Sequence, residues 1–371
     1  MSTRSRKLLV FTGGGTGGHV YPGLAIIEGL VSERKVSSEE ICWIGSNKGM
    51  ERDILAKHDI SFFAVPSGKF RRYFSLRNVT DLFLIFLALI KSLVFMLKRR
   101  PALLFSKGGY VSVPPVIAAR ICRIPVITHE SDLDPGLATR INARFADRVC
   151  VSYKETMKFF PSSAAHKIVV TGNPIRPAVL TGNRDAGRRV FGLPGEKPLV
   201  FVIGGSLGAR QINQLMAEVI DDILPHAEVL HQTGGGNGSD NPRPGYVRRE
   251  YIHNEMPHVL AAADIVITRA GAGTLWECGT LGKAMVLIPL GTEGSRGDQL
   301  RNSRYFEDAG AALVLSDENA APAALRAAVL DLVASRETRL RMGEAAQKIT
   351  GNTGVQACGD LIHEFLQDCG S

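Results

Sequence analysis

Short apolar segments, each followed by a polar or glycine-rich turn and then a helical stretch, recur along the whole 371-residue chain. Segments of this length that are apolar throughout are typical of strands buried on both faces of a parallel sheet. The first half contains six of them, at residues 7–12, 41–45, 61–65, 103–105, 125–128 and 148–151. This alternation predicts an α/β protein built from βαβ units.

The same pattern starts again after an interruption. Two prolines fall within residues 172–177, and new strand segments follow at 198–203, 227–232, 265–268 and 284–289. We therefore expect two doubly wound, Rossmann-like domains, residues 1–175 and residues 176–371. The stretch from Ala321 onward is rich in alanine and helical in pattern, and its last helices are candidates for returning to the first domain.

The charge is unevenly divided between these two halves. Residues 1–175 contain 25 Lys and Arg against 13 Asp and Glu, whereas residues 176–371 contain 19 against 23. A basic half suggests an anionic partner, which can be a nucleic acid, a membrane surface or phosphate groups. The sequence has no helix-turn-helix, zinc or RNP pattern, so we expect no nucleic acid partner.

The six cysteines are widely spaced and form no CxxC pair. This spacing argues against a zinc ribbon, a thioredoxin motif and a disulfide scaffold, and it fits a reducing cytoplasm. The basic N-terminal residues precede a short apolar run that ends in glycines, so we expect a first strand there and not a signal peptide.

A loop with five glycines, Gly13 to Gly18, joins the first strand to a helix that has Pro22 in its expected first turn. Such a loop lets a ligand approach the backbone, and the helix N-terminus behind it attracts anions. The spacing matches G-x-G-x-x-G, but the acidic residue that would follow the second strand in a nicotinamide-dependent oxidoreductase is missing. His19 closes the loop as either a general base or a residue that only holds the loop.

Two similar loops fall in the second half. GGSLGAR follows the strand ending at 203, and RAGAGTLWECG follows the strand ending at 268. Both suggest phosphate sites. Glu277, in the first turns of the second helix, suits a sugar diol, or else it simply complements the helix dipole. The polar run GDQLRN at 297–302 either contacts sugar hydroxyls or starts a helix.

Asp132 and Asp134 form a D-x-D pair of the kind that binds metals. So short a motif arises often by chance, and Pro135-Gly136 marks the segment as a turn. Glycine-rich anion loops also reduce the need for a metal to hold a diphosphate. We therefore expect no metal and no other cofactor.

The segment from 82 to 97 has only Lys91 and Ser92 as polar residues. Sixteen helical residues span only about 24 Å, short of the roughly 30 Å of a bilayer core. The segment also lies between two strands of one predicted sheet, so we expect a crossover helix. The basic residues from Lys69 to Arg100 favour docking on an anionic membrane surface over a helix that is wholly buried.

Taken together, several motifs resemble those of the bacterial N-acetylglucosaminyltransferases that make lipid II in peptidoglycan synthesis. They are GGGTGGHVYPGLAI, SKGGYVSVPPVIAA, HESDLDPGLATRINARFAD, TGNPIR, GGSLGAR, RAGAGTLWE and GDQLRN, in the expected order. The resemblance implies a GT-B fold with two domains facing a cleft. It also implies metal-independent, inverting transfer from UDP-N-acetylglucosamine to the 4-hydroxyl of the muramoyl sugar of lipid I. Such enzymes are peripheral proteins on the cytoplasmic side of the plasma (inner) membrane.

The resemblance also assigns roles to individual residues. His19 matches the residue near the acceptor and is the first choice of base, with Glu130 second and Tyr110 a further cleft position. The residues implied to bind the donor are Thr16, Gly17, Gly18, Asp132, Arg176, Ser206, Ile252, Ala272, Gly273, Thr274, Leu275, Trp276, Glu277, Gln299 and Asn302. The chain departs from the family where Ser131-Asp132 replaces a usual Gln-Asn and where Asp298 replaces a usual glutamine.

Overall fold

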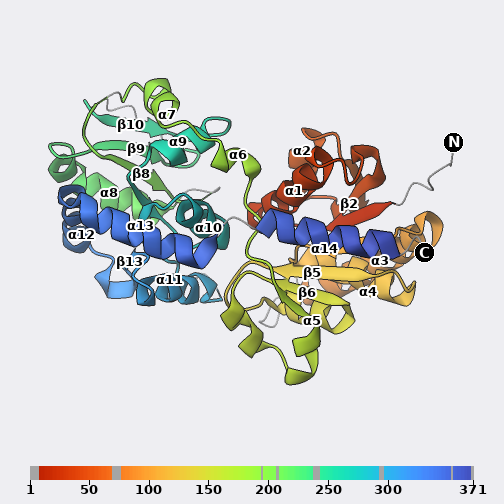
Figure 1. Ribbon diagram of the computed structural model, residues 1–371. Helices are drawn as coiled ribbons and strands as arrows, with labels where there is room; N and C mark the ends of the chain where they lie inside the picture. The colour runs from red at the N-terminus through yellow and green to blue at the C-terminus, as the bar shows by residue number, and fades with distance from the viewer. Residues whose placement is uncertain are drawn as a thin grey trace. The chain divides into compact units, whose positions relative to one another are not determined.

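The computed structural model describes residues 8–68, 77–193, 195–205, 209–236, 243–291, 296–351 and 354–368. The chain divides into two compact units (Figure 1). Unit 1 is Met1–Pro174 with Thr353–Ser371, and unit 2 is Ile175–Asn352. The division falls one residue before the predicted one, and the final helix belongs to unit 1.

Unit 1 is a parallel sheet covered by helices on both faces. Its strands are β1 (Leu9–Thr12), β2 (Ile41–Ser46), β3 (Ser61–Val65), β4 (Leu103–Ser106), β5 (Val126–Glu130), β6 (Arg148–Val151) and β7 (Ile168–Val170). Its α-helices are α1 (Gly17–Ser32), α2 (Glu51–Ala56), α3 (Arg77–Arg99), α4 (Val113–Ile121), α5 (Leu137–Phe145) and α14 (Gly354–Asp368). Short 3-10 helices are η1 (Ser38–Glu40), η2 (Tyr110–Ser112), η3 (Lys154–Phe159) and η4 (Ser162–Lys167).

The seven strands of this sheet lie in the order β3-β2-β1-β4-β5-β6-β7. Successive residues of β1 point to opposite faces, so Leu9 and Phe11 enter one apolar cluster and Val10 enters another. The order reverses direction between β1 and β4. In open α/β sheets this switch point, at the carboxyl ends of the strands, is where ligands bind.

Helix α14 packs along α1, as Figure 1 shows for the blue helix beside the red one. Its Cys358 and Ile362 are fully buried in the apolar cluster that contains Phe11 of β1. The end of the chain therefore completes one face of the first sheet.

Helix α3 is longer than the sequence predicted. It covers 23 residues, and its segment Thr80–Arg99 is long and apolar enough to cross a membrane by length and composition. The length argument from residues 82–97 is thus wrong, because flanking polar residues extend the helix. The topological argument is confirmed, since α3 connects β3 and β4 of one sheet. Only 28% of the apolar window is buried, so α3 is a surface crossover helix.

Unit 2 repeats this architecture. Its strands are β8 (Leu199–Ile203), β9 (Glu228–Gln232), β10 (Tyr246–Arg249), β11 (Ile265–Thr268), β12 (Ala284–Leu287) and β13 (Leu313–Val314). Its helices are α6 (Pro177–Leu180), α7 (Arg184–Val190), α8 (Arg210–Ile223), α9 (Met256–Ala262), α10 (Ala272–Thr280), α11 (Asp298–Asp308), η5 (Asp317–Asn319), α12 (Pro322–Ala334) and α13 (Arg336–Thr350). The parallel order β10-β9-β8-β11-β12-β13 places its switch point between β8 and β11.

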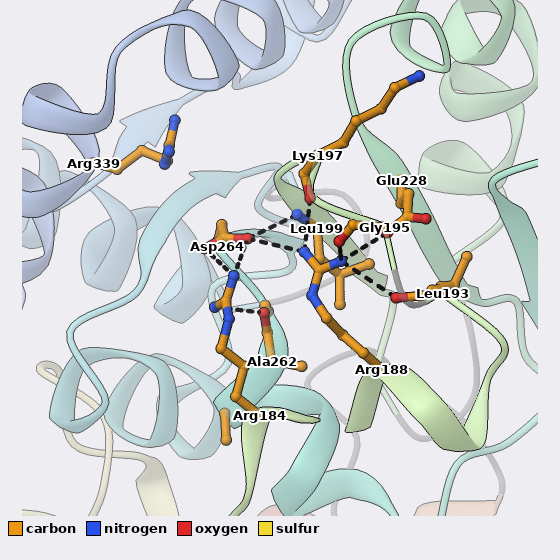
Figure 2. Close-up of polar contacts among 12 residues, drawn as sticks. Arg184, Arg188, Leu193, Gly195, Lys197, Leu199, Glu228, Ala262, Asp264 and Arg339 are labelled. Atoms are coloured by element: carbon orange, nitrogen blue, oxygen red, sulfur yellow. Dashed lines mark hydrogen bonds and ion pairs between the residues drawn. The ribbon is translucent and has the colours of Figure 1, made fainter. Parts of the chain in front are cut away.

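A buried ion network stabilises the amino-terminal edge of this second sheet (Figure 2). Arg188 is 7% exposed, and its Nη1 lies 2.7 Å from Glu228 and 2.6 Å from the carbonyl oxygen of Gly195. Asp264 accepts hydrogen bonds from the Arg184 side chain and from the backbone N–H of Leu199, and these lower its pKa although burial opposes them. Because the network lies at the edge opposite the switch-point loops, we assign it to folding.

Candidate functional site

The switch point of unit 1 brings two predicted site residues together. His19 lies in the first turn of α1, after the loop that follows β1, and Tyr110 begins η2, after the loop that follows β4. Strands β1 and β4 are paired neighbours, with Thr12 opposite Ser106. The sequence therefore places both side chains correctly at one carboxyl edge.

The imidazole of His19 is held in one orientation. Its Nδ1 lies 3.1 Å from the carbonyl oxygen of Lys107. A carbonyl only accepts, so Nδ1 donates, and in the neutral ring Nε2 carries the lone pair. The side chain is half-buried. A histidine held in this tautomer is suited to remove a proton through Nε2.

Glycines after β4 allow the His19 ring to approach the backbone. Gly109 has φ of 77°, and a Cβ there would lie 3.0 Å from Cδ2 of His19 and 2.4 Å from the carbonyl oxygen of Gly14. Real Cβ atoms essentially never lie closer than 3 Å to a backbone atom. Gly109 is therefore required both by its left-handed conformation and by the closeness of the two loops.

The glycine loop of unit 1 packs closely against side chains of the same unit. A Cβ on Gly14 would lie 2.5 Å from Oε1 of Glu51, and one on Gly15 would lie 2.8 Å from the Tyr110 ring. Much of its glycine content thus serves close packing and not an open ligand cradle. The helix also begins at Gly17, so Pro22 lies inside α1 and not in the expected first turn. Thr16 and Gly18 are exposed, which leaves their predicted donor contact a prediction.

Tyr110 lies in a partly apolar setting beside this loop. Burial is the main cause that raises its phenol pKa, and the nearby Glu51 carboxylate adds to it, while a hydrogen bond with Ser67 acts in the opposite direction. The phenol therefore remains a neutral donor at physiological pH.

Glu130, the second candidate for the base, is bound to the loop that follows β5. Its Oε1 accepts the backbone N–H groups of Ser131 and Asp132 at 2.9 and 3.1 Å, and its Oε2 accepts that of Gly136 at 3.0 Å. The residue is only 4% exposed. These three bonds give Glu130 a structural role in shaping the 131–136 turn, which favours His19 as the base.

The D-x-D pair is accommodated within the same turn. Asp134 forms an ion pair with Arg140 at 2.8 Å, while Asp132 is half-buried next to the Glu130 carboxylate. Among the described residues, no group of three or more His, Cys, Asp or Glu side chains is arranged to hold a metal ion.

The switch point of unit 2 has open glycine positions. Gly205 follows β8, and Gly271 and Gly273 lie at the start of α10, after β11. A Cβ on any of the three would have no atom of the described residues within 4 Å. Gly271 also caps α10 without a side chain, so the N–H groups of the first turn point to this open space. Ser206, predicted to contact the donor, lies outside the described residues.

Two predicted donor-binding residues bind each other. Arg176 donates from Nε to Oε1 of Glu277 at 2.8 Å and from its Nη2 to Oε2 at 2.9 Å. The Glu277 side chain is 13% exposed and that of Arg176 is 31% exposed. A bidentate pair of this kind fixes the orientation of both groups at the middle of α10, beyond its first turn.

Other predicted donor residues have mixed surroundings. Leu275 and Trp276 are buried, so only their backbone could contact a ligand, while Thr274 is half-buried and Ala272 is buried. Asn302 is also fully buried, and its amide donates to the carbonyl oxygen of Ala270 at 3.2 Å. This contact shows Asn302 supporting the loop after β11.

The two remaining predicted donor contacts, Gln299 and Ile252, each take part in a hydrogen bond between a glutamine side chain and a backbone N–H. Gln299 accepts the backbone N–H of Leu290 through Oε1 at 3.0 Å, and it is half-buried. The backbone N–H of Ile252 donates to Oε1 of Gln232 at 2.9 Å. The carbonyl of Ile252, and not its N–H, is therefore the backbone group better suited to contact the nucleobase of the donor.

Sequence reasoning missed three buried polar residues at these switch points. Glu51 is fully buried below Gly14, Arg269 is 8% exposed at the end of β11, and Lys107 is 1% exposed at the end of β4. Arg269 donates to Gln211 at 2.8 Å and to the carbonyl of Ile288 at 2.7 Å, and burial lowers its pKa. The sequence feature that could have identified Lys107 and Arg269 is their position, because each directly follows an apolar strand.

Family models match both units. Residues 9–151 match the glycosyltransferase family 28 N-terminal domain, and residues 199–356 match the family 28 C-terminal domain. Among solved structures, MurG of Acinetobacter baumannii superposes with a TM-score of 0.74 at 24% identity, over 96% of this chain and 99% of that one. A UDP-GlcNAc 2-epimerase of Neisseria meningitidis bound to UDP-GlcNAc gives 0.66 at 14% identity, over 98% and 100%. These likenesses confirm the predicted GT-B class of fold.

Curated relatives are closer in sequence. A protein of Treponema denticola is 40% identical over 97% of this chain and 98% of its own, and one of Bacillus thuringiensis is 41% identical over 97% and 99%. Both are named UDP-N-acetylglucosamine–N-acetylmuramyl-(pentapeptide) pyrophosphoryl-undecaprenol N-acetylglucosamine transferase, the second with the suffix 3. With both domain models matched and relatives this similar over nearly full length, the chain belongs to glycosyltransferase family 28.

Proposed function

We propose that this protein transfers N-acetylglucosamine from UDP-N-acetylglucosamine to the 4-hydroxyl of the muramoyl sugar of lipid I, which gives lipid II for peptidoglycan. The names of the relatives at 40 and 41% identity supply the two substrates. The observation that carries the proposal is the contrast between the two switch points. One has open glycine positions at the N-terminus of α10 among the described residues, and the other presents an oriented imidazole.

The donor is proposed to bind unit 2. The open positions at Gly205, Gly271 and Gly273 leave room for a diphosphate at the N-terminus of α10. Glu277 would accept from the ribose hydroxyls while Arg176, already paired with it, lies beside the phosphates. Charge that develops on the departing UDP would meet N–H groups that are already oriented, which lowers the barrier.

The acceptor is proposed to bind unit 1. Nε2 of His19 would take the proton of the acceptor hydroxyl as its oxygen attacks the anomeric carbon and the bond to UDP breaks. The new glycosidic bond replaces the phosphate ester bond with inversion, the electron pair leaves with UDP, and the proton stays on the imidazole. No step in this sequence calls for a metal.

An anionic membrane surface is the proposed docking partner of α3. One face of this helix exposes Leu82, Phe83, Phe86, Leu87, Ile90, Val94 and Leu97, from 36% to 62%. Lys98, Arg99 and Arg100 are exposed at its end. A cavity of about 370 Å³ beyond the end of α4 is lined by Arg120, Arg123 and Arg148 together with Asp147, Ile124, Pro125 and Phe365. Apolar side chains flanked by cations fit an anionic bilayer. The predicted contributors Lys69, Arg71 and Arg72 lie outside the described residues.

Charge substitutions on α3 are expected to release the protein from membranes. In the double variant Phe83→Glu, Phe86→Glu, partitioning onto phosphatidylglycerol vesicles should fall by more than about tenfold, because two apolar contacts become anionic. Vesicle sedimentation measures this. The matched control is Val190→Glu, Leu340→Glu, which adds the same charge at two residues of unit 2 that are each 55% exposed. Equal partitioning of both double variants would refute α3 as the docking face.

Nucleotide binding tests the proposal against an oxidoreductase, which the G-x-G-x-x-G spacing also allows. Isothermal titration should show binding of UDP and UDP-N-acetylglucosamine and none of NAD or NADH. Binding of NAD or NADH without UDP would overturn the proposed function.

A further inference from the structure

The switch point of unit 1 contains a buried charge that the proposed mechanism does not use. Lys107 directly follows β4 and is 1% exposed, although lysine is almost never fully buried unless it is paired. Its Nζ donates to Oγ of Ser131 at 2.6 Å, and that hydroxyl donates to Oδ1 of Asn173 at 2.7 Å. The ammonium is thus fixed under the loop that follows β5.

The backbone of Lys107 ties the same point to the base. Its N–H donates to the carbonyl oxygen of Thr12 at 2.7 Å, and its own carbonyl accepts from His19. Its Cβ lies 3.2 Å from where a Cβ on Gly13 would be. Lys107 therefore contacts the glycine loop, the proposed base His19 and the turn that contains Glu130 and Asp132, which we call the acidic turn.

Two carboxylates belong to the turn that this ammonium contacts through Ser131. Glu130 is 4% exposed, and Asp132 lies two residues further along the turn. Burial lowers the pKa of Lys107 to about 8, while Glu130 and Asp132 both act to raise it. At neutral pH the ammonium stays mostly protonated. Without it, two negative charges would be uncompensated at the carboxyl edge of the sheet, in a region that has to admit anionic substrates.

We propose that Lys107 is a positioning residue whose buried ammonium offsets the charge of Asp132, so that the acidic turn can lie at the carboxyl edge of the sheet where an anionic diphosphate substrate binds. This inference rests on the proposed transfer reaction.

The test is a double-mutant cycle between Lys107 and Asp132, with kcat and KM measured for both substrates. Lys107→Met removes the charge at similar volume, and Lys107→Gln also keeps a hydrogen-bond donor for Ser131. Each is expected to lower kcat/KM by about tenfold, mainly through a higher KM for the anionic substrates. The double variant Lys107→Met, Asp132→Asn should come within about threefold of Asp132→Asn alone.

The outcomes separate the inference from the proposed function. Wild-type values in Lys107→Gln and Lys107→Met would overturn it. A loss of kcat/KM in the Lys107 variants that Asp132→Asn does not restore would also overturn the inference, because the ammonium would then act only in folding. If Lys107→Met does not fold, as judged by thermal melting, the cycle is run with Lys107→Gln and judged by the same criteria. An inactive wild-type protein would instead refute the transfer reaction itself.

Discussion

Replacing His19 with alanine is expected to lower kcat by about 100- to 10,000-fold, the usual contribution of a general base. The reason lies in the orientation of the ring, in which Nδ1 donates to the carbonyl oxygen of Lys107 and Nε2 carries the lone pair of the neutral imidazole. Binding of UDP should change little, because the contacts proposed for its diphosphate and ribose lie in unit 2. Steady-state kinetics with both substrates, together with UDP titration, measures the two effects separately.

The control for this variant is a second histidine of the same unit. His58 is 38% exposed and lies 3.4 Å from Glu28, away from the switch-point loops. His58→Ala should keep wild-type kcat and melting temperature. If His19→Ala keeps kcat within a few-fold of wild type while it remains folded, another group is the base, and Glu130 would have to be reconsidered.

Filling the open position at Gly273 is expected to abolish tight donor binding. The Cβ of a leucine there would have no atom of the described residues within 4 Å, and leucine is a good helix former, so the fold should be preserved. The side chain would occupy the space proposed for the diphosphate. Loss of two charge-assisted hydrogen bonds, each worth about 1.5–3 kcal/mol, weakens binding by about 100-fold or more.

Gly273→Ala is the matched variant, because it makes the same kind of change to the helix with far less volume. Its affinity for UDP-N-acetylglucosamine should lie between those of wild type and Gly273→Leu. Titration calorimetry gives the affinities, and melting curves check the fold. Equal donor affinity in all three proteins would show that the diphosphate does not bind at the α10 N-terminus.

Much of the fold was accessible from the sequence because its strands are buried on both faces. The segments 61–65, 148–151 and 265–268 match β3, β6 and β11 without an error at either end. The strands that the sequence missed are β7, β10 and β13, which form edges of the two sheets. β3 is also an edge strand, but its five residues include an apolar run of four. β7 and β13 are only three and two residues long and β10 is half polar, so none of the three gives a clear strand pattern.

The candidate site was predictable in its loops and not in its buried charges. Glycine-rich turns after apolar strands marked both switch points, and chain order placed His19 and Tyr110 there. The burial of Lys107 and Glu51 depends on tertiary packing, which no local pattern reports. The same holds for the pairing of Arg176 with Glu277, residues 101 positions apart.

The central claim is tested most directly by incubating the protein with UDP-[14C]N-acetylglucosamine and a short-chain lipid I analogue in the presence of EDTA. We expect radiolabelled disaccharide product that depends on both substrates and forms without a metal. Product that forms only after magnesium is added would contradict metal independence and implicate Asp132 and Asp134. Absence of product under both conditions, from protein that still binds UDP, would contradict the assignment of lipid I as acceptor.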